Sequence, residues 1–277
     1  MALSQALIQR LVSGLVLAAI MLAVILVAPH AGVAVFFAAL FLVGAWEWAR
    51  LTSLTRAVER YAYMFATAVL MALGWWIRDS DGVLVWLGAA SVLWVLIGVV
   101  LGRYHRRDDR GPRWQVALRL VGAFLISAAW LAFVKLHQVH ALWLLYVLGL
   151  VAIADSFAYF SGKLYGRRKL APDISPGKTR EGVIGGLLGV VLFAIIVAYA
   201  IELSPVQARY VVLLSVLVGV VSVAGDLFES LLKREAGVKD SGMILPGHGG
   251  ILDRFDSHIA AAPVFFLGLN WILAAAP

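Results

Sequence analysis

The sequence contains no cysteine among its 277 residues, which excludes disulfide bonds and thiolate-ligated metal centres. Only 14% of the residues are charged, whereas soluble domains average about 25%. With 62% hydrophobic residues, a chain of this length cannot bury all its apolar side chains away from water. We therefore expect lipid as the solvent. The remaining metal ligands are carboxylates, histidines and carbonyls, which favour hard cations such as Mg²⁺.

Most of the chain consists of long apolar runs with few charged residues. Runs of about 17–25 apolar residues are typical of membrane-spanning helices. The sequence therefore predicts an all-α, polytopic integral membrane protein with about nine transmembrane helices. The predicted spans are Leu11–Ala28, Gly32–Ala49, Tyr61–Ile77, Gly82–Leu101, Val116–Val134, Ala141–Phe160, Val183–Ile201, Tyr210–Leu231 and Ile259–Ala275.

Basic residues are distributed unevenly across the predicted membrane. If the amino terminus and the loops after even-numbered spans share one side, that side holds all 23 basic residues except Arg78, Lys135 and Arg209. Because Lys and Arg favour the cytoplasmic side, we predict a cytoplasmic amino terminus and a carboxyl terminus outside. The net charge of +7 then reflects topology and contact with anionic membrane lipids, and predicts no nucleic-acid partner.

The two halves of the sequence differ in their loops. Residues 1–140 carry about five predicted helices with mostly short connections. Residues 141–277 contain two long cytoplasmic loops, 162–182 and 233–258, rich in glycine, proline and charge. This asymmetry predicts that 141–277 is the catalytic region. Its segment 182–189 has glycines in small-xxx-small spacing, which permits close helix contact within one subunit or between two.

Acidic residues within apolar runs are candidate functional groups, because ionisable side chains are costly inside a membrane. The acids within or at the ends of such runs are Glu47, Asp155, Asp226 and Glu229. Asp226 and Glu229 are three residues apart and therefore share a helix face. For both, a buried ion pair that fixes helix packing is the structural alternative.

The 233–258 loop combines carboxylates with glycine-rich backbone. Helix ends bearing Asp226 and Asp253 could hold a divalent cation, since Mg²⁺ takes one or two protein carboxylates plus phosphate and water. The segment 246–250 is Pro-Gly-His-Gly-Gly, whose backbone can approach phosphate oxygens closely. His248 could donate a hydrogen bond, act as a general acid, bind a metal or serve a structural role.

The 162–182 loop follows Asp155 and carries the basic cluster Arg167, Arg168 and Lys169. Ser175–Thr179 is predicted to open the next helix, and a helix start with Ser, Thr and Lys favours an anion. Together the two loops suit a reaction between a soluble polyphosphate and an anionic lipid headgroup. Such chemistry needs charge neutralisation and in-line positioning more than covalent catalysis.

The segment Ser230–Ser257, SLLKREAGVKDSGMILPGHGGILDRFDS, resembles the signature of the phosphatidate cytidylyltransferases, also called CDP-diacylglycerol synthases. The signature runs S-x-x-K-R, then K-D, then P-x-H-G-G-x-x-D-R-x-D. It falls on Ser230, Lys233, Arg234, Lys239, Asp240, Pro246, His248, Gly249, Gly250, Asp253, Arg254 and Asp256. Asp155–Gly182 resembles a second region shared by the family. The resemblance is strong over residues 150–260 and rests on helix count alone in residues 1–140.

The resemblance implies a reaction of CTP with phosphatidic acid that gives CDP-diacylglycerol and pyrophosphate. It implies Mg²⁺ held by Asp226 and Asp253, and a second, monovalent cation such as K⁺ would fit. The implied catalytic residues are Asp226, Asp253, Lys233, Arg234, His248 and Asp256, the last two as positioning groups. The implied substrate-binding residues are Ser175, Lys178, Thr179, Lys239, Asp240, Gly249, Gly250, Arg254, Asp155 and Glu229. Arg168 and Lys169 would lie near lipid headgroups.

The resemblance also implies a homodimeric membrane enzyme. Short termini and compact size suggest a bacterial inner membrane, and the loop positions predict an active site that faces the cytoplasm. Two alternatives stay open. One is a related CTP-dependent transferase or kinase that acts on another lipid. The other is an anionic metabolite transporter, which would need basic residues deep in helices, whereas nearly every base here lies at one membrane face.

Overall fold

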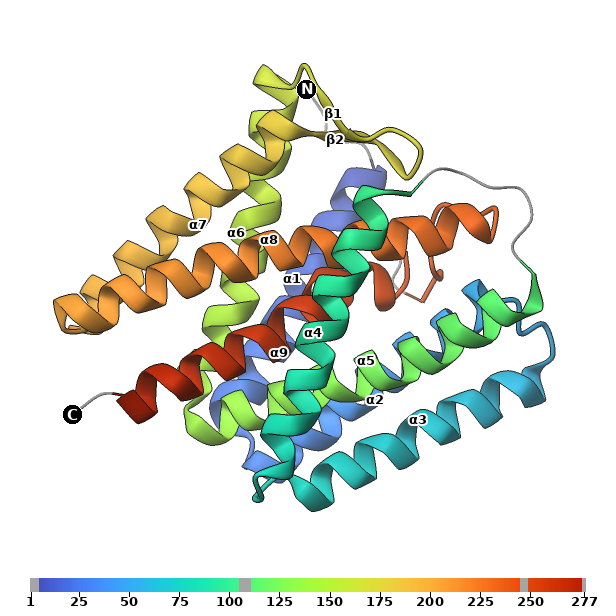
Figure 1. Ribbon diagram of the computed structural model, residues 1–277, viewed down its shortest axis with the longest axis horizontal. Helices are drawn as coiled ribbons and strands as arrows, with labels where there is room; N and C mark the ends of the chain where they lie inside the picture. The colour runs from blue at the N-terminus through green and yellow to red at the C-terminus, as the bar shows by residue number, and fades with distance from the viewer. Residues whose placement is uncertain (1–4, 105–110, 245–248, 276–277) are drawn as a thin grey trace. The chain divides into compact units, whose positions relative to one another are not determined.

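The structure is a computed structural model that describes residues 5–104, 111–244 and 249–275 (Figure 1). In these ranges the chain forms nine α-helices and one two-stranded hairpin. The helices are α1 (Gln5–Val27), α2 (His30–Leu51), α3 (Ala57–Ile77), α4 (Gly82–Gly102), α5 (Pro112–Val139), α6 (Ala141–Tyr165), α7 (Arg180–Ala200), α8 (Pro205–Glu235) and α9 (Leu252–Ala275). The strands are β1 (Lys169–Ala171) and β2 (Ser175–Thr179).

The helices support the prediction of an all-α, polytopic membrane protein. Among the described residues, seven helices are long and apolar enough to cross a membrane, namely α2, α4, α5, α6, α7, α8 and α9. In α1 the apolar helix found is the shorter stretch Val12–Val27, and α3 falls outside the set. The count of nine spans and the orientation of the termini therefore stay predictions.

Several helices continue beyond their predicted apolar spans. The helix α8 extends past both ends of the predicted Tyr210–Leu231, and α9 begins at Leu252 instead of Ile259. Hydropathy marks the length of chain that lipid can cover, whereas backbone hydrogen bonding continues into polar turns. Asp253, expected just before the last helix, consequently lies in its first turn.

The polar loop predicted at 162–182 contains an antiparallel hairpin in which Lys169 pairs with Thr179 and Ala171 with Ser175. The prediction that Ser175–Thr179 opens the next helix is wrong for all but its last residue, because this stretch forms β2. Thr179 is the N-cap of α7, and its hydroxyl oxygen accepts a hydrogen bond from the Gly182 N–H at 3.1 Å. Pro176, which lacks an N–H, is tolerated because a two-stranded hairpin consists of edge strands.

One compact unit comprises α1, α2, α3 and α5, the start of α6 and the described part of 232–256. Within it α2, α3 and α5 lie side by side, and α1 contacts α2 (Figure 1). The Trp48 indole N–H donates to the Leu118 carbonyl at 3.0 Å, and a Cβ at Gly122 would collide with this indole. Phe255 of α9 packs against Phe41 in this core, with ring centroids 5.5 Å apart.

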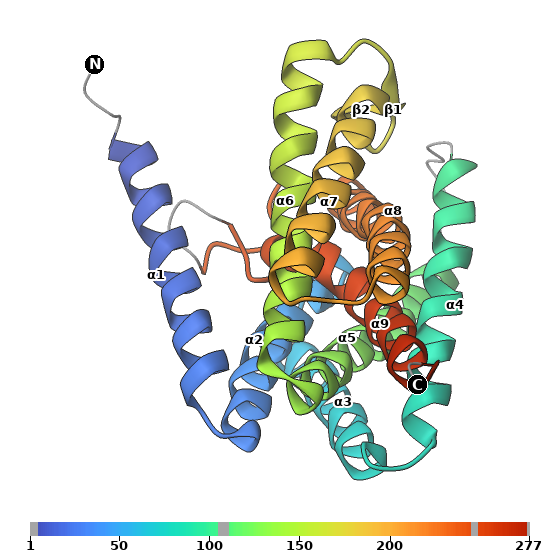
Figure 2. The same cartoon turned by 90° about the vertical axis from the view of Figure 1, so that its left-hand side faces the viewer.

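The second unit comprises α4, most of α6, the hairpin, α7, α8 up to Leu231 and α9 from Ser257. Here α6 and α7 run side by side (Figure 2). A Cβ at Gly182 would lie 2.9 Å from the Ala158 carbonyl oxygen, and one at Gly186 would lie 2.9 Å from that of Ala154. The small-residue face of α7 therefore packs on α6 of the same chain. The predicted functional division at residue 140 stays a prediction.

Candidate active site

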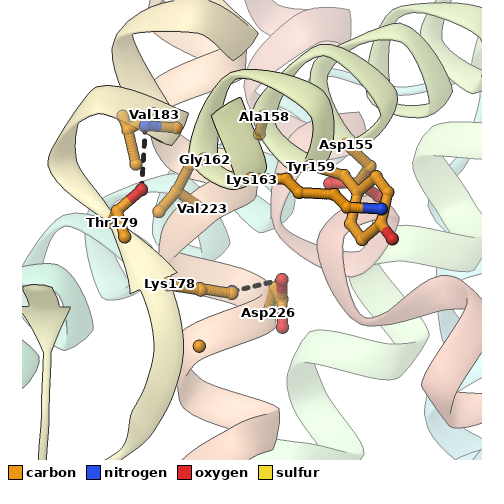
Figure 3. Close-up of a pocket in the computed structure, with 12 residues that line it drawn as sticks. Asp155, Ala158, Tyr159, Gly162, Lys163, Lys178, Thr179, Val183, Val223 and Asp226 are labelled. Carbon is orange, nitrogen blue, oxygen red and sulfur yellow. Dashed lines mark hydrogen bonds and ion pairs between the residues drawn. The ribbon is translucent and has the colours of Figure 1, made fainter. Parts of the chain in front are cut away.

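A pocket of about 480 Å³ lies within the second unit, where α6, β2, α7 and α8 meet (Figure 3). This volume is within the range of small-molecule sites. Its lining residues are Asp155, Ala158, Tyr159, Gly162, Lys163, Gly177, Lys178, Thr179, Gly182, Val183, Val223 and Asp226. The structure thus brings together four residues that the sequence singled out, namely Asp155, Lys178, Thr179 and Asp226.

The pocket contains an ion pair between the Lys178 ammonium of β2 and the Asp226 carboxylate of α8 (Figure 3). The Ser230 hydroxyl also donates to Asp226 Oδ1 at 3.4 Å. Because the two charged side chains are 24% and 30% exposed, water screens their attraction and the pair is weak. Either charge can therefore exchange its partner for a phosphate or a cation at modest cost.

One face of α6 forms the opposite wall of the pocket. Asp155, Tyr159 and Lys163 follow one another at four-residue intervals, which places them on the same helix face. The Lys163 ammonium lies 5.9 Å from the centroid of the Tyr159 ring. Tyr159 and Lys163 were not among the predicted site residues, and their spacing from Asp155 is the signal that could have found them.

Two predicted substrate-binding residues take part in local structure. Thr179 is 7% exposed, and its hydroxyl oxygen accepts the Gly182 N–H at the start of α7. Ser175 pairs with Ala171 in the hairpin and does not line the pocket. Thr179 thus builds a wall of the pocket, and substrate contact by either residue stays a prediction.

The basic cluster after α6 is held by an acid at the start of α7. The Arg168 Nε lies 3.0 Å from Glu181 Oε1, and the backbone N–H groups of Arg167 and Arg168 each donate to Glu181 Oε2 at 3.1 Å. The Arg168 side chain stays 69% exposed, so it is open to a further anionic partner. Its predicted place near lipid headgroups, with Lys169, stays a prediction.

The first unit contains a second cluster of predicted residues, centred on Asp253. Its Oδ1 lies 2.8 Å from the Lys233 ammonium, and the two side chains are 7% and 14% exposed. Its Oδ2 accepts hydrogen bonds from the Gly250 N–H at 2.7 Å, and from the Ser241 N–H and hydroxyl, both at 2.9 Å. The Asp253 carboxylate is thus held by charge and by three donors.

Gly249 is required beside this carboxylate for two reasons. Its φ is +81°, a conformation that L side chains rarely adopt, and an added Cβ would lie 2.6 Å from Asp253 Oδ2. The glycines predicted to approach a phosphate therefore also pack around an acid of the same segment.

The remaining predicted residues are distributed over both units. In the first unit Arg234, Lys239, Asp240 and Arg254 are exposed, and Asp256 is partly buried. In the second unit Glu229 is 2% exposed on α8. Pro246 and His248 lie outside the described residues. Glu47, noted from the sequence without an assigned role, is buried in the first unit and contacts the segment that leads into α9.

The donor chemistry of the two acids fits a hard cation. The structure describes no group of three or more acids and histidines that could hold a metal. Mg²⁺, however, usually takes only one or two protein carboxylates and completes its shell with phosphate and water. Asp226 and Asp253 each present a carboxylate beside a lysine ammonium, so each already occupies an environment that stabilises a negative charge.

Comparison with known proteins extends the resemblance over the chain. The sequence pattern of the Cytidylyltransferase family matches residues 8–272. A phosphatidate cytidylyltransferase of Pseudomonas aeruginosa is 41% identical over 265 residues, covering 93% of this chain and 94% of that protein. One of Haemophilus influenzae is 36% identical over 280 residues, covering 93% and 96%. One of Bacillus subtilis is 45% identical over 132 residues, covering 48% and 49%. The chain therefore belongs to the cytidylyltransferase family.

Proposed function

We propose that this protein transfers the cytidylyl group of CTP to phosphatidic acid and releases CDP-diacylglycerol and pyrophosphate for phospholipid biosynthesis. The observation that carries the proposal is the 41% identity to the phosphatidate cytidylyltransferase of Pseudomonas aeruginosa across nearly the whole of both chains. The pocket with Lys163, Lys178 and Asp226 supports it, because it offers cations and a carboxylate to a polyphosphate substrate.

In the proposed reaction a phosphate oxygen of phosphatidic acid attacks the α-phosphorus of CTP. The bond from that phosphorus to the oxygen that bridges to the β-phosphorus breaks, and pyrophosphate leaves with the electron pair. The attacking oxygen is already ionised near neutral pH, so the reaction needs no strong general base. It needs charge neutralisation and alignment of two anions, for which Lys178 and Lys233 are suited.

We propose Asp226 and Asp253 as the ligands of Mg²⁺. Bound Mg²⁺ supplies positive charge that polarises phosphate oxygens. A carboxylate that binds a divalent cation no longer needs its lysine, so Lys178 and Lys233 would each become available to a phosphate group. A second, monovalent cation such as K⁺ is part of the same proposal.

We further propose that the protein is a homodimer in a bacterial inner membrane, with its active site toward the cytoplasm. The helices that are long and apolar enough to span a membrane support an integral membrane protein, and the relatives come from bacteria. A cytoplasmic site would have access to CTP, and the positive-inside rule predicts that the base-rich loops face the cytoplasm.

The test is turnover by the full chain purified in detergent, with phosphatidic acid, Mg²⁺ and CTP labelled at the α-phosphate. Label should enter a lipid-extractable product, and EDTA should abolish the transfer. Asp226→Asn and Asp253→Asn should each lower turnover by at least about 100-fold. Asp81→Asn is the matched control, because Asp81 is exposed before α4 and makes no side-chain capping bond.

Three results would redirect the proposal. Full activity in both active-site variants would reject these acids as metal ligands. Binding of CTP without transfer to phosphatidic acid would point to another lipid phosphate as the acceptor. A protein that does not bind CTP would favour transport of an anionic metabolite.

A further inference from the structure

A buried acid of α2 caps the beginning of α9. Glu47 is 2% exposed, and its carboxylate accepts hydrogen bonds from the Leu252 N–H at 2.7 Å and the Ile251 N–H at 3.2 Å. The first N–H groups of a helix have no acceptor within that helix, and their positive end favours a negative charge. Glu47, on a helix far away in the sequence, therefore supplies the acceptors that the first N–H groups of α9 lack.

Two glycines leave room for this carboxylate. A Cβ at Gly242 would lie 2.8 Å from Glu47 Cδ, and a Cβ at Gly250 would collide with the Glu47 carboxylate oxygens. Gly250 belongs to the glycine pair assigned above to phosphate binding. In the structure it also admits the carboxylate of α2, which gives this position a packing role that the motif alone does not reveal.

Arg50 holds the same segment one helical turn further along α2. Its guanidinium donates to the Asp240 carbonyl at 3.3 Å and also to the Ser241 carbonyl. Residues three apart share a helix face, so Glu47 and Arg50 act on one side of α2. Glu47 accepts hydrogen bonds from the backbone N–H groups of residues 251–252, and Arg50 donates to the carbonyls of residues 240–241. Both stretches are thereby held to one helix.

The contacts reach Asp253 through Ser241. The Ser241 hydroxyl lies 3.2 Å from Glu47 Oε2 and 2.9 Å from Asp253 Oδ2, and its single hydrogen serves one of them at a time. The Ser241 backbone N–H also donates to Asp253 at 2.9 Å. Leu252, which Glu47 caps, directly precedes Asp253. Glu47 is thus linked to Asp253 in two ways, through Ser241 and through the neighbouring residue Leu252.

We infer that Glu47 and Arg50 are positioning residues that hold residues 240–241 and 251–252 against α2 and thereby orient the Asp253 carboxylate for the reaction. The inference rests on the proposed function in treating Asp253 as a residue of the active site. It assigns a role to α2, a helix outside the region 141–277 that was predicted to be catalytic.

Glu47→Gln is the sharpest perturbation because it preserves size. The carboxylate accepts on both oxygens, whereas an amide has one oxygen and would turn its NH₂ toward an N–H donor in either orientation. We expect the Mg²⁺ concentration for half-maximal turnover to rise about 10- to 100-fold. In hydrogen–deuterium exchange of the full chain, the amides of Ile251 and Leu252 should exchange roughly tenfold faster or more.

Arg50→Ala is the second variant, chosen because Arg50 is exposed and its loss is compatible with folding. It should speed exchange in the peptide 240–244 and raise the Mg²⁺ requirement in the same direction. Glu59→Gln is the matched control. Glu59 accepts the Arg56 N–H at 3.2 Å in a capping box on α3, a role that glutamine also fills.

The outcomes separate this inference from the proposed function. Faster exchange at 251–252 in Glu47→Gln, with a raised Mg²⁺ requirement and unchanged exchange in α3 and α5, supports positioning. Unchanged exchange and Mg²⁺ response in both variants reject it, as does faster exchange throughout the unit, which would mean a purely structural role. If Glu47→Gln does not fold, Arg50→Ala decides. If the wild-type protein has no transferase activity but Glu47→Gln still speeds exchange at 251–252, the proposed function is rejected and the contact of Glu47 with α9 is confirmed.

Discussion

The ion pair between Lys178 and Asp226 separates a structural role from a functional one. We expect Lys178→Met, which keeps most of the side chain's length and removes its charge, to leave stability almost unchanged. Both partners are partly exposed, and an ion pair that water can reach contributes about 0–1 kcal/mol. For a chain of this size, 1 kcal/mol corresponds to a Tm change of about 2–4 °C. Turnover should fall by about 100-fold, because a cation that neutralises phosphate in the transition state is lost.

The assay compares Lys178→Met with wild type in Tm and in transfer of label from CTP to phosphatidic acid. Lys135→Met is the matched control, since Lys135 lies on α5, donates to Gln138 at 2.8 Å and does not line the pocket. A double variant with Asp226→Asn should show a coupling in the free energy of unfolding of no more than about 1 kcal/mol. A Tm loss above about 10 °C with normal turnover in the folded fraction would refute the reasoning, because the pair would then serve packing alone.

Packing and pocket geometry determine the expected effects of three more substitutions. Gly249→Ala should lower the free energy of unfolding by about 1–2 kcal/mol because of the left-handed φ, and its Cβ should displace Asp253. Turnover of the folded protein should therefore also fall, and unchanged turnover would contradict the close approach. Gly122→Ala should lower Tm by several degrees through collision with Trp48, and an unchanged Tm would show that the indole moves at no cost. Tyr159→Leu should raise the KM for CTP or lipid roughly two- to tenfold at constant Tm, a result that unchanged kinetics would exclude.

Local sequence was sufficient to predict functional residues where those residues are close together in the chain. The segment 230–257 could be assigned to the family from its sequence motif alone. It contains both Lys233 and Asp253, which form an ion pair in the structure. The hairpin was missed because Ser175–Thr179 shows no alternation of apolar and polar residues. A strand of this kind forms through hydrogen bonds to its partner, and these bonds leave little trace in composition. The face of α6 that bears Tyr159 was visible as a four-residue spacing and could have been predicted.

The sequence by itself determined the membrane environment, the fold class and the family. Apolar runs require lipid because no core of this size could hide them, and the scarcity of charge makes each acid within a helix conspicuous. Tertiary structure alone decided which groups meet. Glu47 contacts Ser241 across 194 residues of chain, and no spacing rule reaches that far. Whether a buried carboxylate accepts from a helix end or faces an ammonium depends on packing, because each buried charge must find its donors wherever the fold places them.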